Sequence, residues 1–253
     1  MKKVTMPALV KKKGVAKISM VTCYDASFAK LVEKAEIDSI LVGDSLGMVI
    51  KGDTNTLEVD ISEVEYHVKA VRKGAKTPFL IADMPFGSYQ ITVAKGLKNA
   101  VALMKAGAEA VKVEGGKEVS KLISTLTSYG IPVVGHVGLT PQYVNKFGGF
   151  GKRGKTPEER KFIFDSALAV EKAGAEMIVL ESIPEELANE ITSALKIPTI
   201  GIGAGKNTDG QVLVIYDLLG MDENFNPSFL KKQCNLDQII TNALKTYKLE
   251  TEK

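Results

Sequence analysis

The stretch that decides the fold is Asp38-Ser39-Ile40-Leu41-Val42-Gly43-Asp44-Ser45-Leu46-Gly47. Residues 40–43 are apolar or small and show no polar alternation, which is typical of a strand buried on both faces of a parallel sheet. The run then stops at Asp44 and Ser45. Parallel α/β sheets and barrels carry their chemistry at the carboxyl ends of their strands. The stretch therefore predicts a buried strand that brings a carboxylate and a hydroxyl to a functional site.

The same pattern recurs further along the chain. Strand-like runs that lead directly to an acid are found at 79–82 (Asp83), 110–113 (Glu114) and 177–180 (Glu181), and only Lys112 interrupts their apolar character. The sequence Ala-Gly-Ala-Glu precedes two of these runs, at 106–109 and at 173–176. An acid after a single strand often only caps the following helix. Four acids at the ends of four strands instead predict a shared site at one rim.

The order of the predicted elements indicates a barrel. Further strands are predicted at 18–23, 132–136, 198–203 and 212–216, and helices at 27–34, 62–73, 93–105, 118–129 and from 156 onward. Strands that alternate with helices predict βαβ units and a parallel sheet. Eight such units favour closure into a (β/α)8 TIM barrel over an open doubly wound sheet. Because no linker is evident, we expect residues 1–253 to form a single domain, with a short N-terminal arm and a polar, helical C-terminal tail.

The composition is that of an ordinary soluble globular protein. Apolar residues make up 45% of the chain and charged residues 25%, and the net charge is +3. This charge is too small and too scattered to favour binding to nucleic acid. We expect the lysines at 2–3 and 11–13 to lie in a solvated N-terminal arm and not in a binding tail. A secretory signal is not predicted, because the apolar stretch between these lysines is too short. No run approaches the roughly 18 apolar residues of a membrane span.

The cysteines point to a reducing compartment. Cys23 and Cys234 are too few for a disulfide framework, and neither has the spacing of a metal site. Together with the lack of a predicted signal or membrane span, this predicts a soluble, cytoplasmic protein.

A cluster of four carboxylates predicts a divalent cation. Mg²⁺ prefers hard oxygen donors and binds through one or two carboxylates, with water or substrate oxygens in its other positions. Without a cation the acids would repel one another. Lys112 lies two residues before Glu114 and therefore faces the same side of its strand. It is either a counter-ion or, as we favour, a contact to an anionic substrate.

The two histidines have different expected roles. His136 lies between two glycines at the end of its predicted strand, so we expect it at the same rim. His67 falls within a predicted helix and is expected to be structural. Since neither histidine has a histidine partner, a zinc site is not predicted.

Two glycine-rich loops leave alternatives open. Residues 201–205, Gly-Ile-Gly-Ala-Gly, follow the seventh strand, where many barrels bind phosphate through backbone N–H groups. This favours a rival function on a phosphorylated substrate, but the motif is equally consistent with a tight turn. The loop at 147–154 is long enough to form a mobile lid, or to be a plain surface connection.

Seven segments together match a known family. They are Val-Thr-Cys-Tyr-Asp-Ala-Ser-Phe-Ala-Lys (21–30), Leu-Val-Gly-Asp-Ser-Leu-Gly-Met (41–48), Ala-Asp-Met-Pro-Phe (82–86), Val-Lys-Val-Glu-Gly-Gly (111–116), Gly-His-Val-Gly-Leu-Thr-Pro-Gln (135–142), Leu-Glu-Ser-Ile-Pro (180–184) and Ile-Gly-Ile-Gly-Ala-Gly (200–205). With these segments in order over roughly residues 17–221, the chain resembles the ketopantoate (3-methyl-2-oxobutanoate) hydroxymethyltransferase family. Jointly the motifs are specific, although Gly-Asp-Ser alone recurs in other keto-acid barrels.

The resemblance implies a reaction. Members open pantothenate biosynthesis by transferring a one-carbon unit from 5,10-methylenetetrahydrofolate to 3-methyl-2-oxobutanoate (α-ketoisovalerate), giving 2-dehydropantoate (ketopantoate). The keto acid can chelate Mg²⁺ through its carboxylate and keto oxygen, and the cation then stabilises the enolate formed when the C3 proton leaves. The sequence does not indicate which residues hold the pterin.

The resemblance also implies roles for individual residues. It assigns Mg²⁺ to Asp44 and Asp83 with Glu114 nearby through water, the keto-acid carboxylate to Ser45, a substrate contact to Lys112 and the proton acceptor to Glu181. We add His136 to the expected substrate-binding residues. The family further implies a homo-oligomer, commonly a decamer, although the tail after residue 222 departs from longer members.

Two other functions remain open at this point. The first is a Mg²⁺-dependent keto-acid lyase or mutase of the isocitrate lyase and phosphoenolpyruvate mutase type, which shares the barrel and the Asp-Ser strand end. That group typically carries a catalytic cysteine in a Lys-Lys-Cys-Gly-type loop, and the sequence has no such motif. The second is a non-catalytic metabolite-binding barrel, which would have the acids but no base and no turnover.

Overall fold

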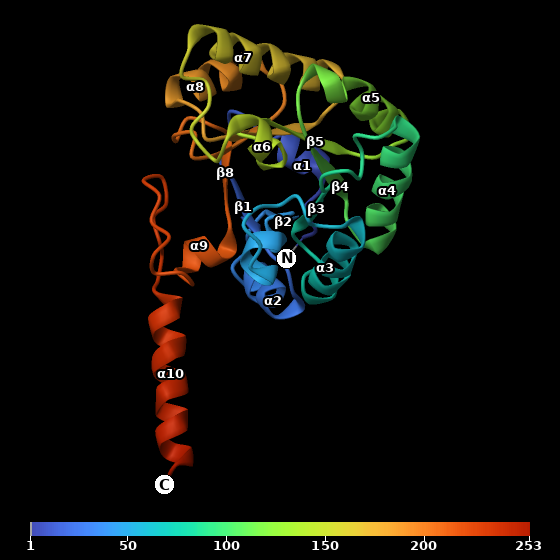
Figure 1. Ribbon diagram of the computed structural model, residues 1–253. Coiled ribbons are helices and arrows are strands. Elements are labelled where there is room, and N and C mark those ends of the chain that lie inside the picture. Colours follow the sequence, from blue (N-terminus) through green and yellow to red (C-terminus); the bar gives the residue numbers. More distant parts are fainter. Residues whose placement is uncertain (1) are drawn as a thin grey trace.

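Eight parallel strands close into a barrel in the computed structural model, which describes residues 2–253 (Figure 1). Each strand pairs with its neighbours in sequence and β8 pairs with β1. The strands are β1 (Ile18–Thr22), β2 (Ser39–Val42), β3 (Phe79–Asp83), β4 (Ala110–Glu114), β5 (Val133–Gly138), β6 (Met177–Glu181), β7 (Thr199–Ile202) and β8 (Gly210–Leu213). The predicted (β/α)8 barrel is therefore confirmed.

Helices alternate with these strands and surround the barrel. The α-helices are α1 (Met6–Val10), α2 (Ala26–Lys34), α3 (Ile61–Gly74), α4 (Val93–Ala106), α5 (Ser120–Ser128), α6 (Val144–Phe147), α7 (Pro157–Lys172), α8 (Glu185–Ala194), α9 (Ile215–Leu219) and α10 (Leu236–Thr251). Three short helical turns complete the set: η1 (Gly47–Lys51), η2 (Lys117–Val119) and η3 (Pro141–Tyr143).

Local capping explains where two of these helices begin. Helix α7 starts as predicted, with Thr156 accepting a hydrogen bond from the backbone N–H of Glu159 and a proline in the first turn. In α3, Ser62 and Glu65 have the spacing that predicts a capping box, but the box is formed two residues earlier. There the Glu63 carboxylate accepts from the backbone N–H of Asp60 at 2.7 Å.

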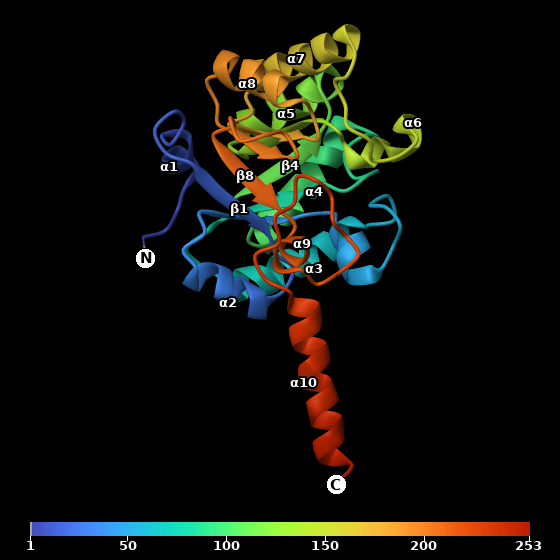
Figure 2. The ribbon, with the colours of Figure 1, turned by 90° about the vertical axis from the view of Figure 1, so that its left-hand side faces the viewer.

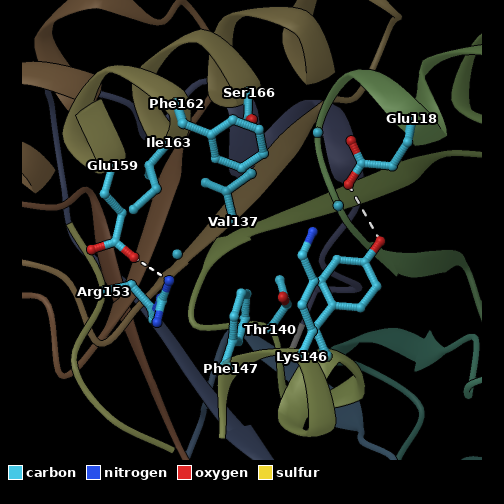
Figure 3. A pocket seen from close by; sticks show the side chains of 14 residues that line it. Glu118, Val137, Thr140, Lys146, Phe147, Arg153, Glu159, Phe162, Ile163 and Ser166 are labelled. Carbon is cyan, nitrogen blue, oxygen red and sulfur yellow. Dashed lines mark hydrogen bonds and ion pairs between the residues drawn. The ribbon is translucent and has the colours of Figure 1, made fainter.

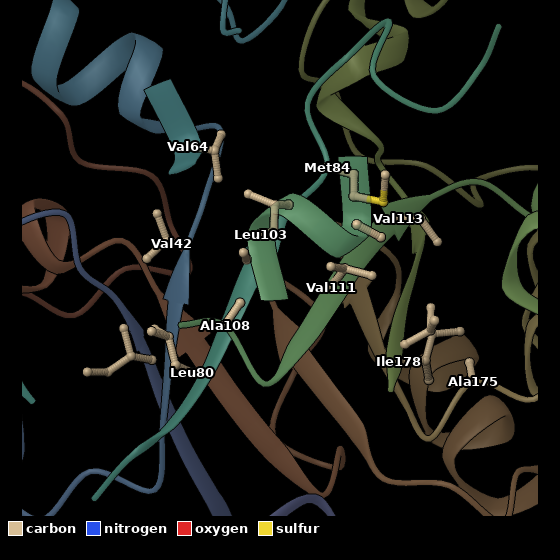
Figure 4. Close-up of a cluster of buried hydrophobic side chains, with 14 of the residues drawn as sticks. Val42, Val64, Leu80, Met84, Leu103, Ala108, Val111, Val113, Ala175 and Ile178 are labelled. Carbon is tan, nitrogen blue, oxygen red and sulfur yellow. The ribbon is translucent and has the colours of Figure 1, made fainter. Parts of the chain in front are cut away.

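Two apolar layers hold the barrel together. The outer layer lies between the strands and the surrounding helices, and Figure 4 shows part of it, with strand residues Val42, Leu80 and Val111 and helix residues Val64 and Leu103. The inner layer fills the barrel with alternate strand residues such as Met20, Ile81, Val134 and Met177. Because side chains alternate along a strand, the residues of the inner layer share the barrel interior with the polar groups at the strand ends.

Helix α1 closes the amino-terminal end of the barrel. Met6 and Leu9 are buried within the inner layer, and Figure 2 shows α1 at the end of the barrel opposite α6. The expectation of a solvated arm was wrong for Lys12 and Lys13. These lysines are half-buried and form ion pairs with the acids Asp38 and Asp209 of the barrel wall.

The last predicted strand was displaced. It was expected at 212–216, but β8 ends at Leu213 and Ile215 begins α9. The backbone N–H of Ile215 donates to the Thr22 hydroxyl at 3.0 Å, and Tyr216 packs edge to face against Phe28 with 5.6 Å between ring centroids. A short apolar run cannot distinguish a strand from a buried helical turn, so the pattern continued across the boundary.

The C-terminal helix α10 projects away from the barrel (Figures 1 and 2). None of its residues is buried, and its exposed side chains include Ile239, Leu244 and Tyr247. Among residues 2–253, no helix combines the length and the apolar character that crossing a membrane requires.

Candidate active site

The register of the strands brings the predicted residues together. Asp83 pairs with Lys112 across β3 and β4, and Glu114 pairs with His136 across β4 and β5. All four side chains are buried at the carboxyl ends of their strands. Asp44, directly after β2, joins them, since its backbone N–H donates to Oδ2 of Asp83 at 3.0 Å. The structure thus gathers these residues into one polar cluster at the rim.

Lys112 lies within the acids of this cluster. Its Nζ is 3.1 Å from Oδ1 of Asp83 and 3.5 Å from Oε1 of Glu114. Burial disfavours the charged ammonium, but the charges of Asp83, Glu114 and Asp44 outweigh this effect and raise the pKa of Lys112. The geometry is that of a buried counter-ion, and a contact from Lys112 to a substrate stays a prediction.

His136 faces a carboxylate with each ring nitrogen. Nδ1 is 3.3 Å from Oε1 of Glu114, and Nε2 is 3.2 Å from Oε2 of Glu181. Burial and the neighbouring Lys112 oppose protonation, but Glu114 and the hydrogen-bonding contact to Glu181 raise the pKa of His136 to about 9. Nδ1 also lies 3.1 Å from Nζ of Lys112, so His136 connects the Lys112 cluster to Glu181.

The buried acids do not share one protonation behaviour. Burial, reinforced by the charges of Asp83 and Glu114, raises the pKa of Asp44 well above its usual range. Burial also raises the pKa of Asp83, despite the opposing charge of Lys112. For Glu114, burial is outweighed by His136 and Lys112, which lower its pKa. Asp44 and Asp83 are therefore the two acids whose charge is least compensated by the protein.

The backbone around Glu181 is fixed by close packing. Gly138 pairs with Glu181 across β5 and β6 and has φ +99°, and a Cβ there would lie 2.3 Å from the Glu181 carbonyl oxygen. Only glycine allows this approach. Ser182 has φ 48°, which is uncommon for a residue other than glycine, and its carbonyl accepts from the N–H of Arg153 at 2.8 Å. The Glu181 side chain is 22% exposed and so stays accessible to a substrate.

Ser45 lies at the edge of the cluster. It follows Asp44 and is half-buried, and its hydroxyl oxygen is 2.8 Å from the hydroxyl oxygen of the buried Tyr24. Its predicted contact with a keto-acid carboxylate stays a prediction.

Gln142 is a residue that the sequence analysis did not single out. It is buried, its Nε2 donates to Oδ2 of Asp44 at 2.9 Å, and its backbone N–H donates to Oε2 of Glu114 at 3.0 Å. Its Oε1 accepts from the Tyr89 hydroxyl at 2.8 Å. The only available signal was its place at the end of the 135–142 segment. Since it is 98 residues from Asp44 in sequence, no local pattern predicts the contact.

The Asp44–Asp83 pair has the donor chemistry that Mg²⁺ requires. Oδ1 of Asp83 is buried and has no aligned hydrogen-bond partner in residues 2–253, although Lys112 stands at ion-pair distance. No three His, Cys, Asp or Glu side chains of the described chain are arranged to hold a metal ion together. Glu114 is turned toward Lys112 and His136 instead. The residues present therefore fit a site built from two carboxylates, which is sufficient for Mg²⁺.

The glycine-rich turn after β7 already holds an acid. The N–H of Lys206 and the side-chain amide of Asn207 donate to Oε1 of Glu185 at 3.3 and 3.1 Å. Gly205 has φ +77°, and a Cβ there would lie 2.3 Å from Cγ of Glu185. A carboxylate in this turn repels a phosphate. The geometry therefore favours the tight turn over the alternative of a phosphate site.

The loop at 147–154 is anchored at its C-terminal end. Arg153 forms an ion pair with Glu159, and its guanidinium lies 4.1 Å from the centroid of the Phe147 ring. The N–H of Gly154 donates to the same glutamate at 2.7 Å. Whether the remainder of the loop moves as a lid stays a prediction.

Comparison with known proteins identifies relatives over nearly the whole chain. A family model described as ketopantoate hydroxymethyltransferase matches residues 3–253. The chain is 51% identical over 245 residues to a 3-methyl-2-oxobutanoate hydroxymethyltransferase of Thermotoga maritima, which covers 97% of this chain and 91% of the relative. It is 50% identical over 235 residues to the protein of that name from Clostridioides difficile, with coverage of 92% and 86%.

Solved structures share the barrel. Phosphonopyruvate hydrolase in complex with oxalate and Mg²⁺ aligns with a TM-score of 0.63 at 15% identity, over 83% of this chain and 80% of that one. A 2,3-dimethylmalate lyase, a member of the PEP mutase/isocitrate lyase superfamily, aligns with a TM-score of 0.62 at 14% identity, over 98% and 96%. At this level of identity the likeness shows the fold alone.

Proposed function

The chain belongs to the ketopantoate hydroxymethyltransferase family, and from this premise we propose that it transfers a hydroxymethyl group from 5,10-methylenetetrahydrofolate to 3-methyl-2-oxobutanoate. The product is 2-dehydropantoate, the first intermediate of pantothenate biosynthesis. The observation that carries the proposal is the buried cluster of Asp44, Asp83, Lys112 and Glu114 at the barrel rim, joined through His136 to the accessible Glu181.

The proposed chemistry begins with removal of the C3 proton by Glu181. His136 lies against Glu181 and orients its carboxylate. The C3–H bond breaks, and the resulting carbanion character at C3 forms a bond to the one-carbon unit of the folate. Both C–N bonds of the folate methylene bridge break, and water supplies the oxygen of the new hydroxymethyl group. The C3 proton and one proton of the water end on the two folate nitrogens, so that tetrahydrofolate leaves.

Asp44 and Asp83 are the proposed Mg²⁺ ligands. Burial and the charges of Asp83 and Glu114 disfavour the ionised form of Asp44, and a divalent cation beside the carboxylates would relieve this repulsion. When bound, Mg²⁺ supplies Lewis-acid polarisation of the keto group. In this proposal Glu114 orients Lys112 and His136, Lys112 donates to a substrate oxygen and Ser45 to the substrate carboxylate.

A keto-acid lyase or mutase is the second candidate, because solved members of that superfamily share the barrel. Two observations disfavour it. Cys23 is buried, which raises its pKa to about 11, and Cys234 is exposed near the C-terminal tail. Cys23 follows β1 directly, but its burial and raised pKa make it a poor nucleophile, and Cys234 lies outside the barrel strands.

Product analysis separates these functions. The protein is incubated with Mg²⁺, 3-methyl-2-oxobutanoate and 5,10-methylenetetrahydrofolate, and 2-dehydropantoate is followed by NMR. We expect product with this pair and none from isocitrate or phosphonopyruvate. Turnover of either of the latter two, without 2-dehydropantoate, would support the lyase or mutase. A folded protein that binds the keto acid but turns over no substrate would support the non-catalytic barrel.

We further propose that the protein acts as a homo-oligomer, a decamer by analogy with its family, in the cytoplasm. Helix α10 exposes several large apolar side chains to solvent. Burying them against another copy of the chain would be favourable, which supports assembly. The two free cysteines are consistent with a reducing compartment.

A further inference from the structure

A slot opens near the carboxyl end of β5, on the side that faces the helices, between α6 and α7 (Figure 3). Its floor is formed by Gly115, Val137 and Gly138, the residues that directly follow Glu114 and His136. Arg153 lies at one end of the slot. Its backbone N–H donates a hydrogen bond to the carbonyl of Ser182, the residue that follows Glu181. The slot therefore lies against the chain segments that carry three of the proposed catalytic residues.

The chemistry of the slot is that of a site for a flat, polar heterocycle. Apolar and aromatic groups from opposite walls, Val137, Phe147 and Phe162, line its centre. Phe162 is 62% exposed, an unusual position for a large apolar ring without a partner. Aromatic walls of this kind bind planar rings by stacking.

A carboxylate and a cation stand at the rim of the slot. Oε1 of Glu118 accepts from the hydroxyl of Tyr143 at 3.3 Å, and within residues 2–253 its side chain forms no ion pair. Lys146 forms no ion pair within the described part of the chain, and its Nζ lies 5.8 Å from the centroid of the Tyr143 ring. A carboxylate recognises a pair of adjacent N–H donors with two parallel hydrogen bonds, and a free ammonium recognises an anionic tail.

We propose that this slot binds the folate co-substrate, with the aminopyrimidine edge of the pterin on Glu118 and the anionic glutamate tail near Lys146. A pterin presents an amino group and a ring N–H side by side, which is the donor pair that a carboxylate accepts. In this placement its flat ring stacks on Phe162, and its methylene bridge points toward the strand ends that carry Glu114, His136 and Glu181. This inference rests on the proposed function, since it assigns a place to the second substrate of that reaction.

The test measures binding of (6S)-tetrahydrofolate by calorimetry and the KM for 5,10-methylenetetrahydrofolate. Glu118→Gln removes the acceptor charge but keeps the shape of the side chain, and we expect the Kd and KM for folate to rise about tenfold or more. Phe162→Ala, on the exposed face of α7, should raise both several-fold through loss of stacking. Glu158→Gln, on the same helix but outside the slot, is the matched control and should leave both unchanged.

A folate-independent measurement separates this inference from the proposed function. Exchange of the C3 proton of 3-methyl-2-oxobutanoate in D₂O needs no folate, so Glu118→Gln and Phe162→Ala should exchange at the parental rate. If the parent exchanges but both variants retain parental folate Kd and KM, the slot is not the folate site. If exchange itself falls in these variants, the slot serves the keto acid and the inference is equally overturned. Absence of exchange in the parent would instead contradict the proposed function.

Discussion

Asp44 and Asp83 show how burial can create a demand for a cation. Both carboxylates are buried, their pKa values are raised, and Lys112 offers them only one positive charge. Removing either carboxylate removes a hard donor that no nearby side chain replaces. Asp44→Ala or Asp83→Ala should therefore weaken Mg²⁺ and keto-acid binding together and lower activity well over tenfold, since a Lewis-acid contact is worth several kcal/mol.

The measurement is a Mg²⁺ titration of activity, with Asp165→Ala on the exposed face of α7 as control. Unchanged Mg²⁺ dependence in both site variants would remove these two residues from the metal site.

Gln142 forms a hydrogen bond to one of these two acids, Asp44. Its amide nitrogen bonds to Asp44, while its oxygen is held by Tyr89 and Gln90. Partners of this kind orient metal ligands, and their loss typically costs about 10–100-fold in metal affinity. Gln142→Met keeps the length of the side chain but removes the donor, so the Mg²⁺ concentration for half-maximal activity should rise by about that factor.

Gln90→Met is the control, because Gln90 touches only the far end of the Gln142 amide. Equal Mg²⁺ requirements in the parent and in Gln142→Met would show that the residue only fills space.

The residues of the cluster differ in how far sequence could predict them. Asp83 and Glu181 end apolar runs, and Glu114 ends a run that only Lys112 interrupts. That local pattern follows directly from a buried parallel strand. Gln142 gives no such signal, because its role depends on a contact with a segment 98 residues away. The surroundings of His136 were equally hidden, since Glu114 and Glu181 come from two other strands.

At the scale of elements, the sequence predicts most of the strands, but it does not predict helix α1 at the amino-terminal end of the barrel or the point where β8 ends. The strand at 39–42 follows from its own composition, whereas α1 is a helix of only five residues whose position depends on the interior it seals. The displaced β8 has the same cause. Residues 212–216 are apolar both where they form a strand and where they pack as a helical turn, so only the tertiary contacts of Ile215 fix the boundary.

The segment that follows α1 is locked to the barrel by Asp209. This acid accepts from Lys13 at 2.9 Å and from the N–H of Thr199 at 2.9 Å. Burial opposes ionisation, but these partners lower the pKa of Asp209 below its usual 3.8. Because the pKa of Asp209 is lower in the folded protein than in the unfolded chain, its carboxylate stabilises the fold at pH values above the unfolded pKa. This stabilisation is lost as the pH falls through the folded pKa.

Asp209→Asn should therefore lower the melting temperature at pH 7 by roughly 4–8 °C, for a loss of about 2 kcal/mol in a domain of this size. The difference from the parent should shrink toward pH 3. Asp165→Asn, which removes a surface pair with Lys161, should change little. A constant difference between Asp209→Asn and the parent from pH 7 to pH 3 would contradict the ionised role of Asp209.

At the scale of the whole molecule, α10 is the part that the barrel does not explain. Ile240, Leu244 and Tyr247 recur at helical spacing and are exposed by 39%, 63% and 69%. We expect this face to pack against a second copy of the chain. Leu244→Glu should then reduce the oligomer mass measured by light scattering, because it places a charge in an apolar interface.

Thr246→Glu adds the same charge on a neighbouring position of α10 and should leave the mass unchanged. A parent that is monomeric, or an assembly indifferent to Leu244→Glu, would contradict this role for α10.

The central claim is that the molecule deprotonates a keto acid at C3 with Glu181 as the base. The direct measurement is deuterium uptake at C3 of 3-methyl-2-oxobutanoate, followed by NMR in D₂O at saturating Mg²⁺ and without folate. The parent should exchange the proton, and Glu181→Gln should bind the keto acid normally but exchange it roughly 10²–10⁴-fold more slowly, the usual contribution of a positioned general base. Near-parental exchange in Glu181→Gln would contradict the claim and indicate another base, with His136 the first to test.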